Sequence, residues 1–476
     1  MFCLLIFSFI SALLVSKLGF NFGVVAVVLV IGTPAIIACI FNLEFGLMFT
    51  ITLSFFLLGV KRIADDIPLG ILMDLLVVIM LFGLFISQIK NRDWSFAKNK
   101  VSIFILIWML YNLLQAANPS SESFMAYVYT VRSYAGLMAV YFLLMYAIRS
   151  VEFVTRLLKL WITLMTLVML YGYFQEYIGL LPFEMKWITA EPGRYALLFQ
   201  AGKFRLFSFL SDPLAYGFSM SFTGIMCIIL ANGPYKKYKK VLLRILGILM
   251  LNAMLFSGTR AAYVLPIAAI IFYTVIVQKK KMIITGLALG VLAMIMLNVP
   301  TSDPNIVRLQ SAFHPGDDAS YQVRVKNQAF IQPYIQSHPL GGGLGSVGEW
   351  GKKFSPWSPL ANFPPDSGYI RIATEMGWAG LLLFCTLLFV IFREGIKDYV
   401  RIKDPRLKNY SLAMLCVLFS LVIANFPQEA IGQYPVSILF FVAIAIVNKC
   451  RGFDNNLSSP NASVGVVAKA TKALPF

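Results

Sequence analysis

Apolar runs long enough to cross a lipid bilayer recur along almost the whole chain, and no other feature limits its fold as strongly. A hydrocarbon core about 30 Å thick is spanned by a helix of roughly 20 apolar residues. Such a helix forms all of its backbone hydrogen bonds internally, which it must do because lipid tails offer no donors or acceptors. The chain has 476 residues, of which 59% are hydrophobic and 13% charged, and its mean hydropathy is +0.77. We therefore predict an all-α polytopic bundle of transmembrane helices.

Hydropathy places about 14 spans, with roughly 12 to 14 as the expected range. Their approximate limits are 1–16, 22–41, 44–60, 68–88, 101–114, 124–148, 154–175, 213–231, 240–257, 260–278, 282–299, 366–392, 409–426 and 433–448. The first run lacks a basic leader region and a small-residue cleavage motif, so we interpret it as a span rather than a signal peptide.

The distribution of basic residues predicts the orientation of the bundle. Loops on one side, with the adjoining span ends, hold 25 of the 40 Lys and Arg, and the opposite side holds 14. Positive residues concentrate on the cytoplasmic side, so both termini are predicted to be cytoplasmic. The net charge of +18 is scattered over short loops rather than gathered in a stripe, which excludes a nucleic-acid partner.

Two long segments lie on the predicted outer side, and both are rich in aromatic residues and leucine. They divide the chain into the following parts: N-terminal helices 1–175, a first outer loop 176–212, helices 213–299, a large outer loop 300–365, helices 366–448 and a cytoplasmic tail 449–476. Long loops with this composition are usually functional. No segment resembles a nucleotide-binding domain, and neither the cysteine spacing nor the two histidines predicts a metal site. We expect no metal and no cofactor.

Four arginines approach the outer face from different segments. Arg205 ends the first long loop, Arg260 follows a tight outer turn, Arg324 lies in the second loop, and Arg132 lies about eight residues inside a span. A single intramembrane arginine is often a structural anchor. Several on one face favour an anion site, because the guanidinium fork matches phosphate oxygens. The pattern predicts a pyrophosphate site, with Asp212 beside it in a supporting position.

The stretch "FPPDSGYIRIATEMGWAGLLLF", residues 363–384, places charges at the start of a membrane helix. Asp366 follows two prolines, and it is either the N-cap of the next helix or a general base for an acceptor hydroxyl. Glu375 lies about two and a half turns later, so these two carboxylates are not expected to form a glycosidase-type pair. Tyr369, Arg371 and Glu375 are predicted to support the site.

An amphipathic helix is predicted just before a glycine-rich stretch. Its apolar face carries five residues at helical spacing, namely Val323, Phe330, Ile331, Tyr334 and Ile335. We expect it to lie on the outer surface over the site. The stretch "SHPLGGGLGSVG", residues 337–348, lacks the Gly-Lys-Ser/Thr ending of a nucleotide-binding loop, so a flexible turn is the preferred interpretation.

These motifs resemble those of the O-antigen ligase and O-antigen polymerase superfamily of bacterial glycan assembly. The resemblance rests on "SGTRAAY", on the Arg324 helix leading to "HPLGGGLG", and on "DSGYIRIATEMGWAGLLLF", which together cover roughly residues 200–390. It implies a GT-C-like, metal-independent glycosyltransferase of the cytoplasmic membrane whose donor glycan is carried on undecaprenyl pyrophosphate. Arg205, Arg260 and Arg324 match the arginines thought to grip the pyrophosphate.

Ligase members of that superfamily typically have a histidine where this chain has Asp366, which favours a polymerase. A ligase, which transfers a finished glycan to a lipid or protein acceptor, and a transporter of lipid-linked glycan remain alternatives. The implied partners are the lipid-linked donor, an acceptor glycan or glycolipid and the bilayer, and a chain-length regulator is a candidate protein partner.

Overall fold

The computed structural model describes residues 32–63, 69–200, 202–279 and 319–458, together with the single positions 284, 286 and 310. Its larger elements are α3 (Leu43–Lys61), α4 (Leu69–Asn91), η1 (Ser95–Ala97), α5 (Lys100–Leu114), η2 (Gln115–Ala117), α6 (Phe124–Ala147), α7 (Val151–Tyr177), α8 (Pro182–Thr189), α9 (Pro192–Leu198), β1 (Phe199–Gln200), β2 (Lys203–Phe204), α10 (Pro213–Leu230), α11 (Lys237–Leu255), α12 (Arg260–Val277), α15 (Ala319–Ser337), α16 (Gly348–Phe354), α17 (Gly368–Arg401), α18 (Pro405–Ala424) and α19 (Val436–Ser458).

The described part of the chain is a bundle of long apolar helices, as predicted. Within it, ten helices are long and apolar enough to cross a membrane, and the two-stranded hairpin β1–β2 is its one sheet. The chain is therefore a multi-pass membrane protein. Of the fourteen predicted spans, 1–16 and most of 22–41 and of 282–299 lie outside the described residues. The span expected at 240–257 appears as α11. Lysines and an arginine in its first half make it too polar to be counted among the ten apolar helices.

α10 lies at the centre of the bundle and is almost fully enclosed, whereas α4, α5 and α12 expose much of their apolar surface. α11, α12, α18 and α7 surround it. Gly224 of α10 and Gly247 of α11 let the backbones of these two helices come close. A Cβ on Gly247 would lie 2.8 Å from the carbonyl oxygen of Gly224. Small residues at helix contacts are a common device in membranes, where helix association depends on close packing.

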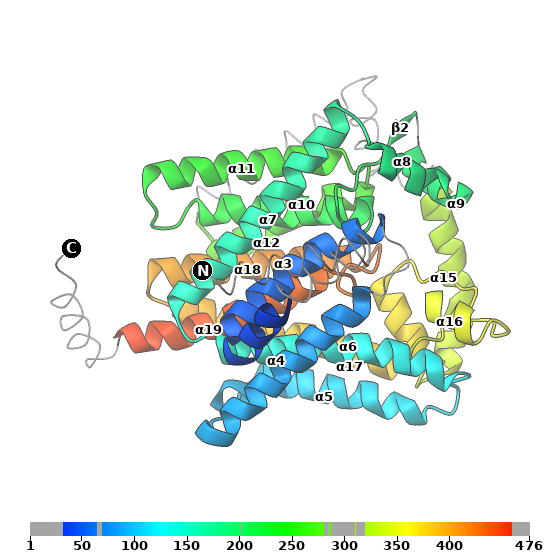
Figure 1. Ribbon diagram of the computed structural model, residues 1–476, viewed down its shortest axis with the longest axis horizontal. Helices are drawn as coiled ribbons and strands as arrows, with labels where there is room; N and C mark the ends of the chain where they lie inside the picture. Colours follow the sequence, from blue (N-terminus) through cyan, green and yellow to red (C-terminus); the bar gives the residue numbers. More distant parts are fainter. Residues whose placement is uncertain are drawn as a thin grey trace, which may run out of the picture.

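The short elements gather at one end of the bundle. Figure 1 shows α8, α9, β2, α15 and α16 at the right-hand end, where α15 crosses the long helices instead of following them. α19 runs toward the opposite end. The predicted face of α15 is partly correct. Ile331 is buried, and Tyr334 and Ile335 pack beside it, but Val323 and Phe330 are 55% and 67% exposed.

The glycine-rich stretch packs against a break in α17. Gly377 interrupts that helix with φ of 70° and ψ of 178°. The amide of Gly342 donates to the carbonyl of Thr374 at 2.9 Å, and that of Gly343 donates to the carbonyl of Glu375 at 2.8 Å. These amides are therefore engaged with the backbone of α17. The stretch is a structural connection between the large loop and α17, rather than a phosphate-binding loop or a freely flexible turn.

Gly377→Ala is expected to destabilise the protein strongly. A Cβ at this position would lie 1.9 Å from the carbonyl oxygen of Pro339, and the backbone conformation itself costs a non-glycine residue about 1–3 kcal/mol. The midpoint of thermal unfolding in detergent should fall by several degrees. Gly452→Ala is the matched control, since a Cβ there meets nothing within 4 Å. Equal midpoints for the two variants would contradict this account of the helix break.

Candidate functional site

A cavity of about 450 Å³ lies at the end of the bundle that α15 crosses, and we call it the arginine cavity. Its lining includes five of the charged residues identified in the sequence: Arg205, Arg260, Arg324, Asp212 and Asp366. They come from the segment after β2, the N-termini of α10 and α12, the first third of α15 and the residues before α17. Tertiary structure thus brings together groups that are far apart in the chain.

Two helix N-termini contribute to the wall. Asp212 caps α10, because its Oδ1 accepts hydrogen bonds from the amides of Leu214 at 2.8 Å and Ala215 at 2.9 Å. Arg260 is the first residue of α12. A cation at a helix N-terminus is opposed by the helix dipole, at a cost of about 0.3–1 kcal/mol, whereas an anion there is favoured. A bound anion would offset this cost.

Arg205 joins the hairpin segment to the turn before α12. Its Nε donates to the carbonyl of Ser257 at 3.1 Å, and its Nη2 donates to Oγ1 of Thr259 at 3.0 Å. Because Thr259 directly precedes Arg260, this contact holds the start of α12 in place. Arg205 therefore borders the cavity and also positions its neighbour.

Asp366 is half-buried, and its Oδ2 accepts a hydrogen bond from Nδ2 of Asn327 at 3.4 Å. The N-cap interpretation of Asp366 is wrong. α17 begins at Gly368 with Ser367 as the N-cap, and the amide of Gly368 donates to the carbonyl of Asn425 at 3.0 Å. The chain enters the helix one residue later than predicted, so this carboxylate belongs to the cavity rather than to the helix end.

Two residues that the sequence analysis did not single out complete the arrangement. Arg194 lines the cavity, and its guanidinium lies 4.1 Å from the ring centre of Trp187. Asn327 lies three residues after Arg324 on α15, and this spacing places both on one helix face. That spacing could have identified Asn327 from the sequence, whereas nothing in the spacing around Arg194 distinguishes it from other loop arginines.

Arg62 supports the segment that leads to Asp212. This arginine follows α3 and is 9% exposed, and it donates to the carbonyls of Ser208 at 2.7 Å and of Leu210. Burial lowers the pKa of Arg62 to about 10, with Glu184 acting in the opposite direction. The side chain therefore remains charged at neutral pH. In the sequence, Arg62 contributes only to the count of basic residues that predicts the orientation.

Arg132 is not among the residues that line the arginine cavity. Its Nε lies 2.9 Å from Oδ2 of Asp74, which joins α6 to α4, and its guanidinium lies 5.4 Å from the ring centre of Tyr129. The predicted grouping of Arg132 with the other arginines therefore does not hold in the structure. A carboxylate at the same depth lowers the free-energy cost of placing a cation inside a membrane, and Asp74 supplies one here.

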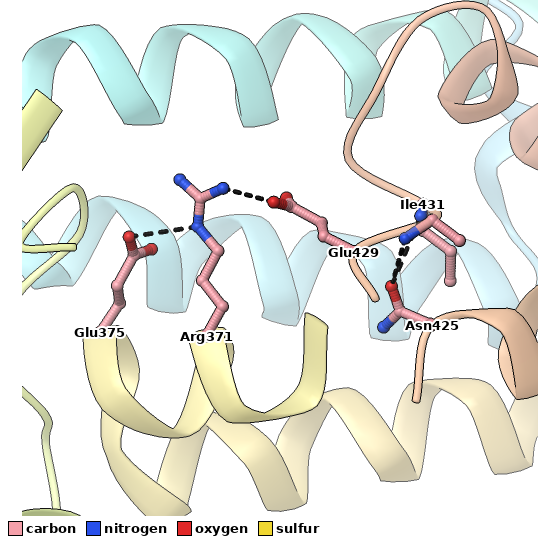
Figure 2. A network of polar contacts seen from close by, with 6 residues as sticks. Arg371, Glu375, Asn425, Glu429 and Ile431 are labelled. Atoms are coloured by element: carbon pink, nitrogen blue, oxygen red, sulfur yellow. Dashed lines mark hydrogen bonds and ion pairs between the residues drawn. The ribbon is translucent and has the colours of Figure 1, made fainter. Parts of the chain in front are cut away.

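Arg371 and Glu375 lie behind the cavity wall, in a network that Figure 2 shows together with Glu429 and Asn425. Nη1 of Arg371 lies 2.5 Å from Oε2 of Glu429, and its Nε lies 3.3 Å from Oε1 of Glu375. Oδ1 of Asn425 accepts from the amide of Ala430 at 3.1 Å.

This network fixes the loop between α18 and α19. Pro427 and Gln428 of that loop line the arginine cavity, and the ion pair from α17 holds the loop beside them. The hydroxyl of Tyr369 adds a hydrogen bond to the carbonyl of Val422 at 2.9 Å. Tyr369, Arg371 and Glu375 thus contact the framework of the cavity rather than its interior.

The fold and site together define a multi-pass membrane protein with a cationic cavity at one end of its bundle. Residues 245–385 match the family model described as O-antigen ligase. The chain is also similar to an O-antigen polymerase of Salmonella muenchen, with 28% identity over 178 residues, and this match covers 36% of this chain and 43% of that relative. Both findings confirm the resemblance to the O-antigen ligase and polymerase superfamily.

The segment matched by the family model contains Arg260, Arg324 and Asp366. It also contains α12, α15, the glycine-rich stretch and the first half of α17. One comparison names a ligase and the other a polymerase.

Proposed function

We propose that this protein is a surface-polysaccharide polymerase. It would join glycan repeat units carried on undecaprenyl pyrophosphate at the outer face of the cytoplasmic membrane, with both termini in the cytoplasm. The observation that carries this proposal is the meeting of four arginines with Asp366 in one cavity at one end of the bundle. The positive-inside rule supports the orientation.

In this reaction the acceptor hydroxyl attacks the anomeric carbon of the donor glycan. The bond from that carbon to the pyrophosphate oxygen breaks, the lipid pyrophosphate leaves with the electron pair, and Asp366 takes the hydroxyl proton. Arg260 and Arg324 would neutralise the charge that develops on the leaving group, which is often the largest single contribution to catalysis. Attack opposite the leaving group inverts the anomeric centre.

Asn327 and Trp187 fit this scheme. The hydrogen bond from Asn327 to Oδ2 would orient the carboxylate of Asp366. The ring of Trp187 lines the cavity, and an aromatic face is suited to a sugar ring. The arginines supply the positive charge in this proposal, so it requires no metal ion and no nucleotide.

A ligase is the second candidate, because the family model that matches residues 245–385 carries that description. Both reactions use the same donor and differ in the acceptor. Asp366 favours the polymerase, since the resemblance implies a histidine at this position in ligases.

The lipid-linked glycan profile of cells lacking this protein tests the proposal. Single repeat units are expected to accumulate on the outer leaflet, because their synthesis and export continue while their joining stops. Glycans are extracted, separated by length and assigned to a leaflet by enzymatic accessibility. Long chains retained on the carrier would identify a ligase instead, and units trapped on the cytoplasmic leaflet would identify a transporter.

A further inference from the structure

A second cavity, of about 430 Å³, lies at the opposite end of the bundle, and we call it the distal cavity. Its lining comes from the C-terminal end of α4, from η1, from the end of α6 and from the C-terminal half of α19. The lining residues are Gln88, Asn91, Asp93, Ser95, Phe96, Tyr146, Arg149 and Lys449. It shares no residue with the arginine cavity.

The amide of Gln88 is the most informative group in this cavity. Gln88 is 4% exposed. Its Oε1 accepts a hydrogen bond from the backbone amide of Asp93 at 2.9 Å, which fixes the direction of the side chain. Its Nε2 is buried and has no hydrogen-bond partner among the described residues. Buried donors are normally paired, so this NH₂ group is available to an acceptor that enters the cavity.

Two cations border the same space. Arg149 stacks on Tyr146, with its guanidinium carbon 4.1 Å from the ring centre and its Nε donating to the Tyr146 carbonyl at 3.2 Å. Lys449 of α19 is half-buried beside it. Asp93 is the one carboxylate in the lining, and its Oδ1 accepts from the amide of Ser95 at 2.9 Å. The cavity thus offers two cations and one amide donor, and its one carboxylate already accepts a hydrogen bond. This balance favours the binding of an anion.

The surface next to the distal cavity is apolar. On α4, Phe82, Phe85 and Ile89 are 61%, 53% and 78% exposed, and they lie within two turns of Gln88. Trp94 is 43% exposed in the loop after α4, which is typical of a membrane–water interface. An acyl chain could lie along this face while its headgroup enters the cavity. These features favour a lipid over a soluble anion.

We propose that the distal cavity binds the phosphate of an anionic phospholipid headgroup. Gln88, Arg149 and Lys449 donate to the phosphate oxygens, and the exposed apolar face of α4 contacts the acyl chains. Because the distal cavity lies at the other end of the bundle, this lipid is distinct from the glycan donor, and the proposal stands independently of the polymerase activity.

Lipid binding to the purified full-length protein tests the site. Binding of phosphatidylglycerol is titrated in nanodiscs of phosphatidylcholine by native mass spectrometry. The variants Arg149→Gln and Lys449→Gln should each weaken binding about fivefold, which is the contribution of one cation near an anionic lipid. Lys98→Gln is the matched control, since Lys98 is exposed on the same side and lies outside the lining. Circular dichroism and gel filtration establish that each variant is folded.

Gln88→Leu provides a second test that keeps the charge constant. It removes the NH₂ donor and should weaken phosphatidylglycerol binding while leaving the protein folded. Equal affinities of all the cavity variants and the wild type would overturn the site. Saturation by inorganic phosphate, with no preference for phosphatidylglycerol over phosphatidylcholine, would overturn the lipid as its occupant.

Discussion

Arg324→Ala should lower polymer formation about 100-fold or more while leaving the protein in the membrane. Arg324 lies in the wall of the arginine cavity on a helix that crosses the end of the bundle. Loss of one preorganised positive group at a developing anion typically costs a factor of 10² to 10³. The measurement is the initial rate of chain elongation with purified enzyme and lipid-linked repeat units.

Lys326→Ala is the matched control for this variant. Lys326 lies on the same helix and carries the same charge, but it is exposed and does not line the cavity. Arg324→Lys should recover only part of the rate, because lysine keeps the charge and loses the planar fork. Arg260→Ala should behave like Arg324→Ala. Full activity in both alanine variants would contradict the role of the arginine cavity in binding pyrophosphate.

Asp366→Asn is expected to reduce the rate by a factor of about 10² to 10⁴, the usual contribution of a general base. The substitution keeps the size of the side chain and its ability to accept a hydrogen bond from Asn327. Since Asp366 does not occupy the N-cap position of α17, the thermal midpoint should stay close to that of the wild type. Rate and thermal unfolding are measured on the same preparation.

Glu349→Gln serves as the control for Asp366→Asn. It makes the same chemical change on α16, at an exposed position that does not line the arginine cavity. We expect both its rate and its stability to be unchanged. If Asp366→Asn kept the wild-type rate, the acceptor hydroxyl would have to lose its proton to another group. If it lost stability in proportion to activity, the residue would be structural.

The sequence predicts which charged residues form the site better than it predicts their local contacts. Arg205, Arg260, Arg324 and Asp366 meet in one cavity, as expected from their shared position on the outer side. The alternative interpretation of Asp366 as the N-cap was wrong, because Ser367 occupies that position. One-residue shifts of this kind are decided by the contact between α17 and α18, which no local pattern contains.

Arg132 was expected in the same cavity, but it does not lie there. Hydropathy correctly placed both Arg132 and Asp74 inside spans, but period and composition cannot tell which helices become neighbours. The packing of α4 against α6 puts their side chains 2.9 Å apart. A charge that looked like part of an anion site is thereby neutralised within the bundle.

The sequence by itself determined that this chain is a helical membrane protein, because apolar length and backbone hydrogen bonding leave few other folds for such segments. It also determined which residues could bind a phosphate group, since that depends on side-chain chemistry. Only the tertiary structure decided which of them share a cavity. It placed Arg194 in the wall of the cavity that Arg324 lines, and it joined Asn327 to Asp366 by a hydrogen bond. It also paired Arg132 with Asp74 and put Gln88 in the lining of a second cavity. The physical reason is that cavities form where separate helices end together, and those neighbours are chosen by packing across the whole bundle.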